Sequence, residues 1–233
     1  VTIVCNQWLK KIMVNEFNVP EHQIKVMHYG FNTEQFILNS KKPATMLRPA
    51  NKKVILYAGR LVELKGVNYL ISALHELKQL REDWVCWIAG SGEKEDELKA
   101  QVNSLGLNEN VLFLGKRDDI PSILKQTDIL VLPTLIENQP ISVIEAQIAG
   151  KAIIASDVGG IPEIIEHGVT GLLTPPKNTT MLTNNLNLLL TNNKLRKSLG
   201  ANAKKWGMTH WSIDLGMLKL MRIYKDAMKG RML

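Results

Sequence analysis

The sequence has few cysteines and no long apolar run. Its two cysteines, Cys5 and Cys86, stand far apart, and Cys86 lies within the apolar segment 84–89, as expected for a core strand. We therefore expect a reducing compartment, because disulfides form and persist in oxidising ones. No segment approaches the ~20 apolar residues of a membrane-spanning helix, and the amino end lacks a basic head followed by an apolar core. These absences predict a cytoplasmic protein and argue against a disulfide-rich secreted one.

Several nucleotide-binding and metal-binding motifs are also absent. The turn Ile88-Ala-Gly-Ser-Gly-Glu93 lacks the third glycine of a dinucleotide fingerprint, which disfavours nicotinamide and flavin dinucleotides. No G-x-x-x-x-G-K-S/T loop is present, so a P-loop nucleotidase is disfavoured as well. The sequence has no D-x-D pair, and its five histidines are scattered without ligand spacing. We therefore expect no metal site and no resident cofactor.

What the sequence does have is a surplus of positive charge. Its 29 lysines and arginines against 22 aspartates and glutamates give a formal net charge of +7. A surplus of this sign favours anionic partners such as nucleotides, nucleic acid or acidic lipid headgroups, without choosing among them. Nucleic acid is not expected as a partner, because aromatic residues are not interleaved with the basic ones.

Short apolar segments alternate with helical segments over most of the chain. In the helical segment 67–80, for example, Leu70, Leu74 and Leu77 recur on one face. Such alternation predicts an α/β domain with a Rossmann-like, parallel sheet of six strands flanked by helices. The expected strands are 54–59, 84–90, 111–115, 129–133, 152–157 and 171–174.

The two ends of the chain differ from this alternating part. Residues 3–17 are predicted to form a helix and 24–28 a strand, without a sheet of their own, as in the tail of a preceding domain. Residues 33–53 contain two prolines, several asparagines and lysines and little periodicity, which indicates a linker. The predicted division is an amino-terminal remnant at 1–32, a linker at 33–53, the main domain at 54–210 and a carboxyl-terminal helix at 211–233.

The first strand-to-helix junction of the main domain carries two cations. Gly59 lets the backbone turn, Arg60 and Lys65 supply fixed positive charges, and a helix starting near Gly66 offers free N–H groups. Together these features suit a diphosphate. Taken alone, the two cations could equally be ordinary surface residues, since position in a fold does not prove a site.

Two carboxylates, Glu137 and Glu145, follow the fourth strand of the main domain. Glu137 lies in the loop, and Glu145 lies about one and a half turns inside the next helix, given ~3.6 residues per turn. Pro140 is predicted as the first helical residue, which leaves the amides around Ile141 and Ser142 free for a phosphate. At this edge of the sheet the two carboxylates can accept hydrogen bonds from two hydroxyl clusters, such as a sugar and a ribose. The alternative is that Glu137 interacts with the helix dipole and Glu145 forms a salt bridge with a neighbouring residue.

The strand that ends at Gly115 is followed by two cations and two aspartates. Asp118 or Asp119 is expected to cap the following helix. The backbone at Lys116 and Arg117 would still be free to meet a planar base edge at the carboxyl side of the sheet.

Four motifs occur in order along the main domain. They are Gly59-Arg-Leu-(x3)-Lys-Gly66, Glu137-Asn-Gln-Pro-(x4)-Glu-Ala146, Ser156-Asp-Val-Gly-Gly-Ile-Pro-Glu-Ile-Ile165 and His167-Gly-Val-Thr-Gly-Leu-Leu173. In order and spacing they resemble family 4 of the retaining glycosyltransferases, the group 1 family, over residues 54–206. The resemblance implies the GT-B fold, in which two Rossmann-like domains face each other across a cleft. This chain would be the carboxyl-terminal half, which holds most of the nucleotide-sugar donor.

The resemblance also implies a role for each residue. Arg60 and Lys65 would grip the donor diphosphate, Glu137 would bind hydroxyls of the transferred sugar, and these three would be the catalytic residues. Glu145 would bind the ribose hydroxyls. The implied reaction is hexosyl transfer with retention of configuration and without an essential metal, with a UDP-sugar as the expected donor. The remaining donor-binding positions would be Gly59, the chain at Arg117 near the base, Asn138, Gln139, Pro140, Ile141 and Ser142.

Most of the family's amino-terminal domain has no counterpart in this sequence. That part carries the acceptor site and a histidine that the family usually contributes near the transferred sugar. We therefore expect the chain to bind donor without turning it over by itself, and the acceptor to be a glycan, a lipid-linked glycan or a small molecule. Many members have glycine in place of Asn138, a change that asparagine's tolerance of left-handed geometry allows.

Other functions fit the sequence less well. A non-catalytic nucleotide-sugar-binding module and a GT-B sugar-nucleotide epimerase both use the same kind of donor cleft. A glycoside hydrolase needs two carboxylates that flank the scissile bond, whereas here Glu145 is assigned to ribose.

The carboxyl-terminal helix is predicted to be amphipathic, with Leu215, Leu218, Arg222 and Lys225 along one face. We expect it to pack back across the hinge onto the amino-terminal domain. The alternative is a peripheral contact with an acidic membrane, at the inner face of the plasma membrane.

Overall fold

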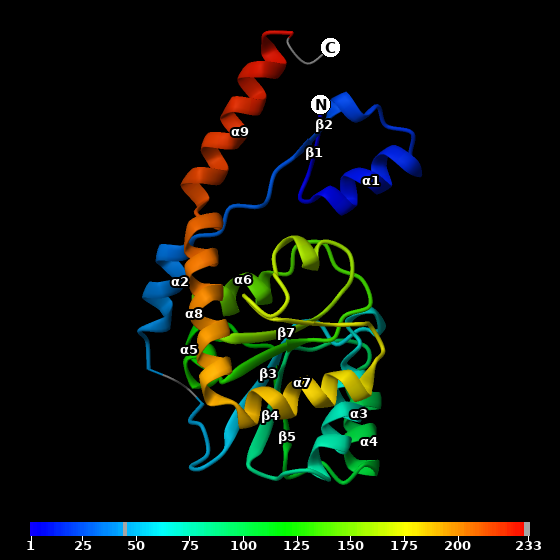
Figure 1. The fold of residues 1–233 in the computed structure, drawn as a ribbon, viewed down its shortest axis with the longest axis vertical. Helices are drawn as coiled ribbons and strands as arrows, with labels where there is room; N and C mark the ends of the chain where they lie inside the picture. The colour runs from blue at the N-terminus through cyan, green and yellow to red at the C-terminus, as the bar shows by residue number, and fades with distance from the viewer. Residues whose placement is uncertain (44–45, 231–233) are drawn as a thin grey trace.

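The computed structural model describes residues 1–43 and 46–230 (Figure 1). Its main body is a six-stranded sheet of order β5-β4-β3-β6-β7-β8, in which all neighbouring strands are parallel. The chain runs outward from β3 to β5, returns to add β6 beside β3, and then runs outward on the other side. This reversal opens a crevice at the carboxyl ends of β3 and β6, where open α/β sheets bind ligands. The strands are β3 (Lys53–Ala58), β4 (Trp84–Ala89), β5 (Val111–Gly115), β6 (Ile129–Leu132), β7 (Ala152–Ser156) and β8 (Leu172–Thr174).

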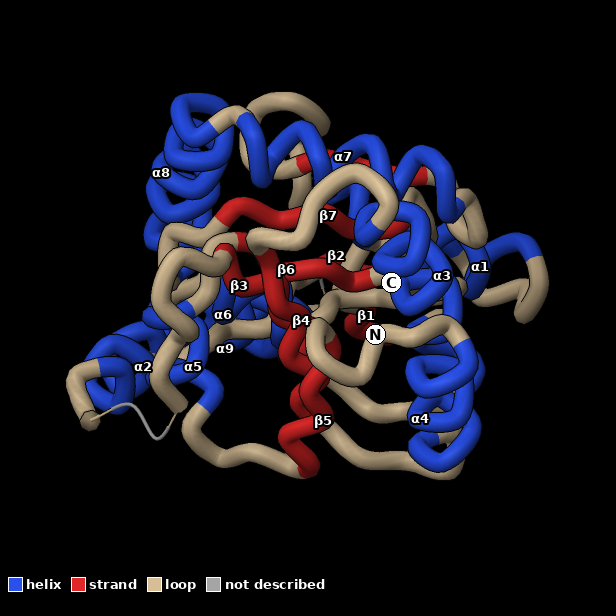
Figure 2. The backbone as a smooth tube through the Cα atoms, turned by 90° about the horizontal axis from the view of Figure 1, so that it is seen from below, coloured by secondary structure: helices blue, strands red, loops and turns tan. Residues whose placement is uncertain are grey.

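Helices cover both faces of this sheet (Figure 2). Helix α3 packs against α4 and α7, and α6 packs against α8. Strands β4 and β7 are buried along their whole length, which explains why their sequences are continuous apolar runs. The predicted α/β fold with a six-stranded parallel sheet is confirmed. The helices of this part are α3 (Val67–Lys78), α4 (Glu95–Ser104), α5 (Ile120–Gln126), α6 (Ile141–Ile148), α7 (Thr179–Thr191) and α8 (Asn193–His210), with 3-10 turns η2 (Glu63–Lys65) and η3 (Ile161–Glu163).

Residues 1–30, called the amino-terminal unit below, contain a small sheet that the sequence did not predict. Strands β1 (Thr2–Val4) and β2 (Ile24–Val26) pair in parallel, with helix α1 (Gln7–Asn15) and the 3-10 turn η1 (Glu21–Gln23) between them. The predicted helix at 3–17 is wrong at its start. The side chain of Asn6 accepts a hydrogen bond from the N–H of Leu9 and caps α1, so the residues before it are extended and pair with β2.

The segment predicted as a linker begins with a helix, α2 (Thr33–Ser40). Asn32 caps this helix by accepting a hydrogen bond from the N–H of Gln35, and Phe36 is buried. Helix α2 packs against α5, so it belongs to the wall of the main body. The domain boundaries themselves stay a prediction.

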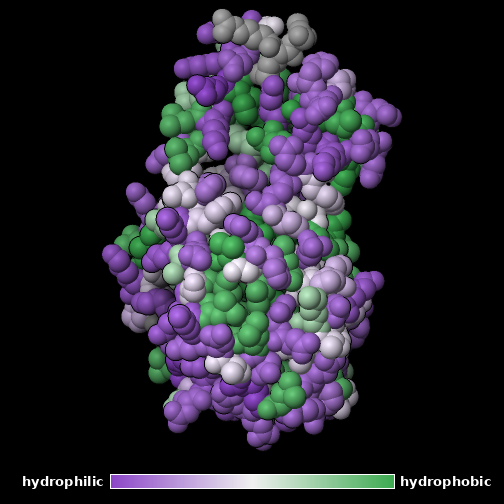
Figure 3. All heavy atoms as spheres, in the orientation of Figure 1, coloured by the Kyte–Doolittle hydropathy of each residue, from purple (hydrophilic) through white to green (hydrophobic). Residues whose placement is uncertain are grey.

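The last helix, α9 (Ile213–Met228), leaves the main body beside the end of the amino-terminal unit (Figure 1). The N–H of Phe31 donates to the carbonyl of Trp211 at 2.7 Å, and a Cβ added to Gly30 would lie 2.9 Å from Cα of Ile213. No residue of α9 is buried, and in Figure 3 hydrophobic residues reach the surface among hydrophilic ones in the upper part of the molecule. Its packing onto a further domain stays a prediction, and residues 231–233 of the predicted segment lie outside the described residues.

None of the helices within the described ranges combines the length and the apolar character needed to cross a membrane.

Candidate functional site

An open cleft of about 710 Å³ runs along the carboxyl ends of three strands. Ala58 of β3, Ala89 of β4 and Leu132 of β6 form part of its wall. Ligand pockets usually measure ~300 to 1,000 Å³, so the cleft can hold a nucleotide-sized molecule. All predicted site residues except Asn138 line it, although they come from separate junctions of the chain.

The turns after β3 and β4 approach each other backbone to backbone at one side of this cleft. Gly90 has a φ of 146°, and a Cβ added to it would lie 1.8 Å from the carbonyl oxygen of Gly59. Only glycine fits such an approach. Arg60, which follows Gly59 in the sequence, is exposed and lines the cleft. Lys65 ends the 3-10 turn η2 just before α3.

Lys65 and Glu137 form an ion pair between Nζ and Oε2, which joins the junction after β3 to the junction after β6. Their side chains are 18% and 15% exposed. Close by, the hydroxyl of Tyr57 donates to the carbonyl of Arg60 at 2.7 Å. Burial, and next the negative charge of Glu137, raise the pKa of Tyr57 far above its usual value, so this hydroxyl stays a neutral donor.

Residues 133–140, called the Glu137 loop below, are contacted by Gly159 and Gly160 of the third motif. The N–H of Gly160 donates to the carbonyl of Glu137 at 3.0 Å. Gly159 has a φ of 58°, and a Cβ added there would lie 1.9 Å from the same carbonyl oxygen. These two glycines therefore fix the backbone of a cleft residue, Glu137.

Glu145 projects from α6 into the same cleft and is partly buried. Burial raises the pKa of its carboxyl group from 4.5 to about 7. Pro140 is the residue before α6 rather than its first residue, with φ −71° and ψ 121°, so that prediction is wrong by one position. The first bond inside the helix runs from the N–H of Val143 to the carbonyl of Pro140, which leaves the amides of Ile141 and Ser142 outside the helical ladder.

Arg117 and Asp119 form a forked pair at the far end of the cleft. The Nε of Arg117 donates to Oδ1 of Asp119 at 2.8 Å, and a terminal nitrogen donates to Oδ2 at 2.8 Å. Asp119 precedes α5 but makes no capping bond with its side chain, so the predicted capping role is wrong for this residue. Its carboxylate fixes the Arg117 side chain instead.

The family profile described as glycosyl transferases group 1 matches residues 39–206. The chain belongs to this family. An uncharacterised glycosyltransferase of Methanocaldococcus jannaschii is 33% identical over 235 residues, which cover 97% of this chain and 60% of the relative. The N,N'-diacetylbacillosaminyl-diphospho-undecaprenol α-1,3-N-acetylgalactosaminyltransferase of Campylobacter jejuni is 32% identical and is matched over 82% of this chain and 54% of its own length.

A solved structure has a similar fold. The crystal structure of Anabaena HepE in complex with UDP-glucose has a TM-score of 0.83 and 25% sequence identity, covering 96% of this chain and 63% of HepE. This group 1 glycosyltransferase chain therefore spans about half to three fifths of the length of these relatives.

The sequence analysis missed part of this cleft. Gly90 and Ser91 line it, although their turn was considered only as an incomplete dinucleotide motif. At the Arg117 end the cleft adjoins a hollow of about 330 Å³ whose walls include Glu145 and, from α2, Gln35. The capping residue Asn32 could have indicated the start of α2, but Pro43 and Pro49, which follow it, favoured a linker.

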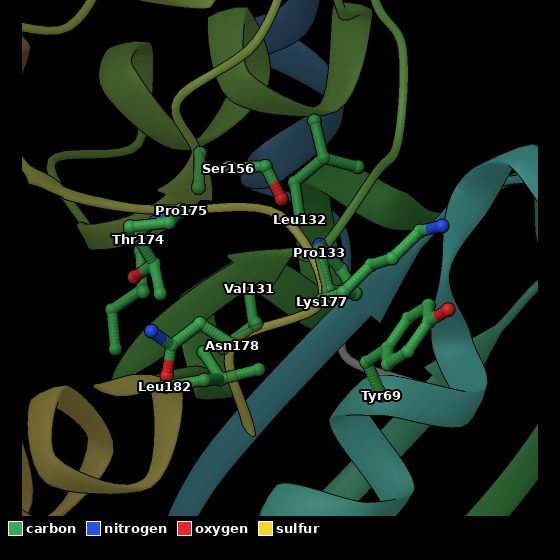
Figure 4. Close-up of a pocket in the computed structure, with 12 residues that line it drawn as sticks. Tyr69, Val131, Leu132, Pro133, Ser156, Thr174, Pro175, Lys177, Asn178 and Leu182 are labelled. Carbon is green, nitrogen blue, oxygen red and sulfur yellow. The ribbon is translucent and has the colours of Figure 1, made fainter. Parts of the chain in front are cut away.

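A much smaller cavity of about 10 Å³ lies among residues of β6, β7, β8 and α7. Figure 4 shows Val131 and Leu132 of β6 and Leu182 of α7 among its lining residues. That volume suits about one water molecule, so this cavity is no candidate for a nucleotide. Within residues 1–43 and 46–230, no cluster of three or more His, Cys, Asp or Glu side chains could hold a metal ion.

Proposed function

We propose that this chain is the donor-binding part of an enzyme that transfers a hexosyl group from a nucleotide sugar with retention of configuration. One observation carries the proposal: two cations, Arg60 and Lys65, and two carboxylates, Glu137 and Glu145, line a single cleft at the carboxyl edge of the sheet. The cations suit a diphosphate, and the carboxylates suit two separate hydroxyl clusters. A nucleotide sugar presents these groups in one molecule.

The order of the residues along the cleft supports a direction for the donor. Lys65 pairs with Glu137, so the diphosphate subsite adjoins the subsite of the transferred sugar, as the covalent structure of a nucleotide sugar requires. Glu145 and Arg117 share the wall of the adjoining hollow, which suits ribose and base at that end. The amides of Ile141 and Ser142 add donors at the amino terminus of α6. Of the remaining loop residues, Asn138 and Gln139 act through the shape of the loop.

A UDP-sugar is the proposed donor. HepE, which shares this fold, binds UDP-glucose in its crystal structure. The Campylobacter jejuni relative is named for an N-acetylgalactosaminyl group and an undecaprenol-linked acceptor. For the present enzyme we propose a glycan, a lipid-linked glycan or a small molecule as acceptor, bound by the rest of the protein.

The proposed chemistry is electrostatic. When the glycosidic bond breaks, negative charge develops on the departing nucleoside diphosphate. Arg60 and Lys65 stabilise that charge, and preorganised charges of this kind supply several kcal/mol, roughly 3 to 4 per donor, in other enzymes. Neither glutamate has to act as an acid or a base, and the proposal includes no resident metal or cofactor.

Helix α9 has two possible partners in this scheme. We propose that its apolar side chains, including Met217, Met221 and Tyr224, pack on the amino-terminal domain of the whole enzyme. Its exposed cations, including Lys219 and Arg222, provide the alternative contact with an acidic membrane. Sedimentation with vesicles of anionic phospholipid decides between them, since no binding ends the membrane alternative.

Calorimetric titration of the chain with a panel of UDP-sugars and GDP-sugars tests the proposed function. We expect micromolar to millimolar binding of at least one UDP-sugar, and at least a tenfold loss in the variant Arg60→Ala. Lys99→Ala is the matched control, because Lys99 pairs with Glu95 on α4, away from the cleft. Binding without transfer is expected for the chain alone, so an assay with the full-length enzyme separates a transferase from a binding module. No binding of any nucleotide sugar would contradict the proposal.

A further inference from the structure

The amino-terminal unit contacts the Glu137 loop directly through Asn6. This side chain is 1% exposed, and its Nδ2 donates to the carbonyl of Asn138 at 3.0 Å. Its Oδ1 accepts from the N–H of Leu9 at 2.7 Å and caps α1. One amide therefore joins the start of α1 to the residue next to Glu137.

The third motif makes this contact possible. A Cβ added to Gly160 would lie 2.0 Å from Nδ2 of Asn6 and 2.2 Å from the carbonyl oxygen of Asn138. Three residues further on, Glu163 accepts hydrogen bonds from the N–H groups of Gln7 at 2.9 Å and Trp8 at 2.8 Å. The motif thus has two functions, because Gly160 admits Asn6 and Glu163 anchors the helix that Asn6 caps.

A second contact between the amino-terminal unit and the Glu137 loop is made by Gln139. The Oε1 atom of Gln139 accepts from the N–H of Tyr29 at 3.0 Å, and its Nε2 donates to the carbonyl of Tyr29 at 3.4 Å. Gln139 is 6% exposed. Both ends of the amino-terminal unit, near residues 6 and 29, therefore touch the loop that carries the sugar-side carboxylate.

We propose that Asn6 is a positioning residue for Glu137, through which the docking of the amino-terminal unit sets the sugar subsite of the donor cleft. This inference rests on the proposed function. The inference extends the proposed function, because recognition of the sugar then depends on how the amino-terminal unit packs on the sheet domain. The diphosphate contact from Arg60 and the ribose contact from Glu145 stand on other elements than the Glu137 loop, and of the assigned diphosphate cations Lys65 is the one that pairs with Glu137.

The experiment compares binding of the sugar with binding of the UDP part of the donor. The chain and its variants are titrated with UDP and with whichever of UDP-glucose, UDP-galactose, UDP-GlcNAc and UDP-GalNAc binds the unaltered chain most tightly. The variant Asn6→Asp keeps an oxygen for the cap of α1 and removes the donor to Asn138. Asn6→Ser also keeps an oxygen for this cap without adding charge, and its side chain is one bond too short to replace the contact of Nδ2 with Asn138. Asn192→Asp is the matched control, because Asn192 caps α8 through the N–H of Leu195 and is exposed.

In both Asn6 variants we expect Kd for the UDP-sugar to rise about tenfold and Kd for UDP to change less than twofold. A general loss of structure would raise both constants, and the control variant should change neither. Unchanged Kd values for the UDP-sugar in the Asn6 variants, or equal losses for UDP and the UDP-sugar, would overturn the inference while leaving the proposed function intact. If the unaltered chain binds neither UDP nor any UDP-sugar of the panel, the proposed function fails and this inference fails with it.

Discussion

Lys65 and Glu137 are 72 residues apart in the sequence and form an ion pair across the crevice between β3 and β6. The pair connects a cation assigned to the diphosphate with a carboxylate assigned to the sugar. It also keeps the Glu137 loop close to the turn after β3 before any ligand is bound. A donor that enters the cleft therefore encounters Lys65 and Glu137 as an ion pair.

Removal of one member of this pair should cost more stability than removal of both. In Lys65→Met the carboxylate of Glu137 loses its ion-pair partner in a mostly buried site, and we expect a loss of about 2 kcal/mol in the free energy of unfolding. The double variant Lys65→Met with Glu137→Gln should regain most of that loss. Urea unfolding of the two single variants and the double variant measures the coupling. Additive losses would mean that the pair contributes nothing to the fold.

The raised pKa of Glu145 predicts a dependence of stability on pH. Its folded value of about 7 lies above its usual 4.5, so between these two pH values the folded protein keeps a proton that the unfolded chain releases. The free energy of unfolding should fall as pH rises from 4.5 to 7 and then level off. Since one pKa unit corresponds to about 1.4 kcal/mol, Glu145→Gln should gain about 3 kcal/mol relative to the unaltered chain at pH 8. Urea unfolding at pH 4.5 and pH 8 checks this, and a gain that is equal at both pH values would contradict it.

The same carboxyl group should make donor binding depend on pH. If ribose hydroxyls donate to Glu145, ionisation of Glu145 favours binding, so affinity should rise as pH rises through about 7. UDP-glucose is the suitable probe, because its diphosphate is a diester and does not titrate near neutrality. Titration calorimetry between pH 5.5 and 8.5 should give a sloping affinity for the unaltered chain and a flat one for Glu145→Gln. A slope that persists in the variant would assign the titration to another group.

Two glycines with similar backbone geometry should respond differently to alanine. Gly168 has a φ of 77° and free space around it, so Gly168→Ala should cost about 1 kcal/mol, the penalty of the left-handed conformation. Gly159 has a φ of 58°, and its new Cβ would collide with the carbonyl of Glu137. We expect Gly159→Ala to lose more stability and also to weaken binding of a UDP-sugar, because the Glu137 loop must move. Thermal unfolding and calorimetry of the two variants test this, and equal behaviour would show that the loop is not held there.

Gln147 fixes the helix that carries Glu145. Its Nε2 donates to the carbonyl of Ile164 at 2.7 Å, and its Oε1 accepts from the indole N–H of Trp211 at 2.6 Å, with the side chain fully buried. Gln147→Leu leaves both partners unsatisfied, and we expect a loss of about 2 to 4 kcal/mol. Gln35→Leu, at an exposed position of α2, should change stability by no more than about 0.5 kcal/mol. Chemical denaturation compares the two, and a small effect at Gln147 would refute this account of the contact.

Local patterns were sufficient to predict the sheet and most of the cleft. Buried parallel strands are read as continuous apolar runs, and β4 and β7 are of this kind. The carboxyl ends of such strands meet at one edge of the sheet, so Arg60, Lys65, Glu137 and Glu145 could be expected to share a site. Their individual roles stay predictions.

The amino-terminal part was harder to predict because its structure depends on distant partners. Strand β1 has three residues, and its partner β2 lies about twenty residues later. No local periodicity therefore indicates that these two segments pair. The contacts of Asn6 with Asn138, and of Glu163 with the start of α1, span more than a hundred residues. No pattern within a short window encodes them. The capping residues Asn6 and Asn32 were visible in the sequence and would have given the true starts of α1 and α2.

The central claim is that a nucleotide sugar occupies the cleft between the junctions after β3 and β6. Hydrogen exchange of the chain, followed by mass spectrometry with and without a saturating UDP-sugar, tests it most directly. We predict slower exchange in residues 59–66 and 137–145 and no change in α7, which lies away from the cleft. Binding that leaves both of these segments unprotected, or that protects only other parts of the chain, would contradict the claim.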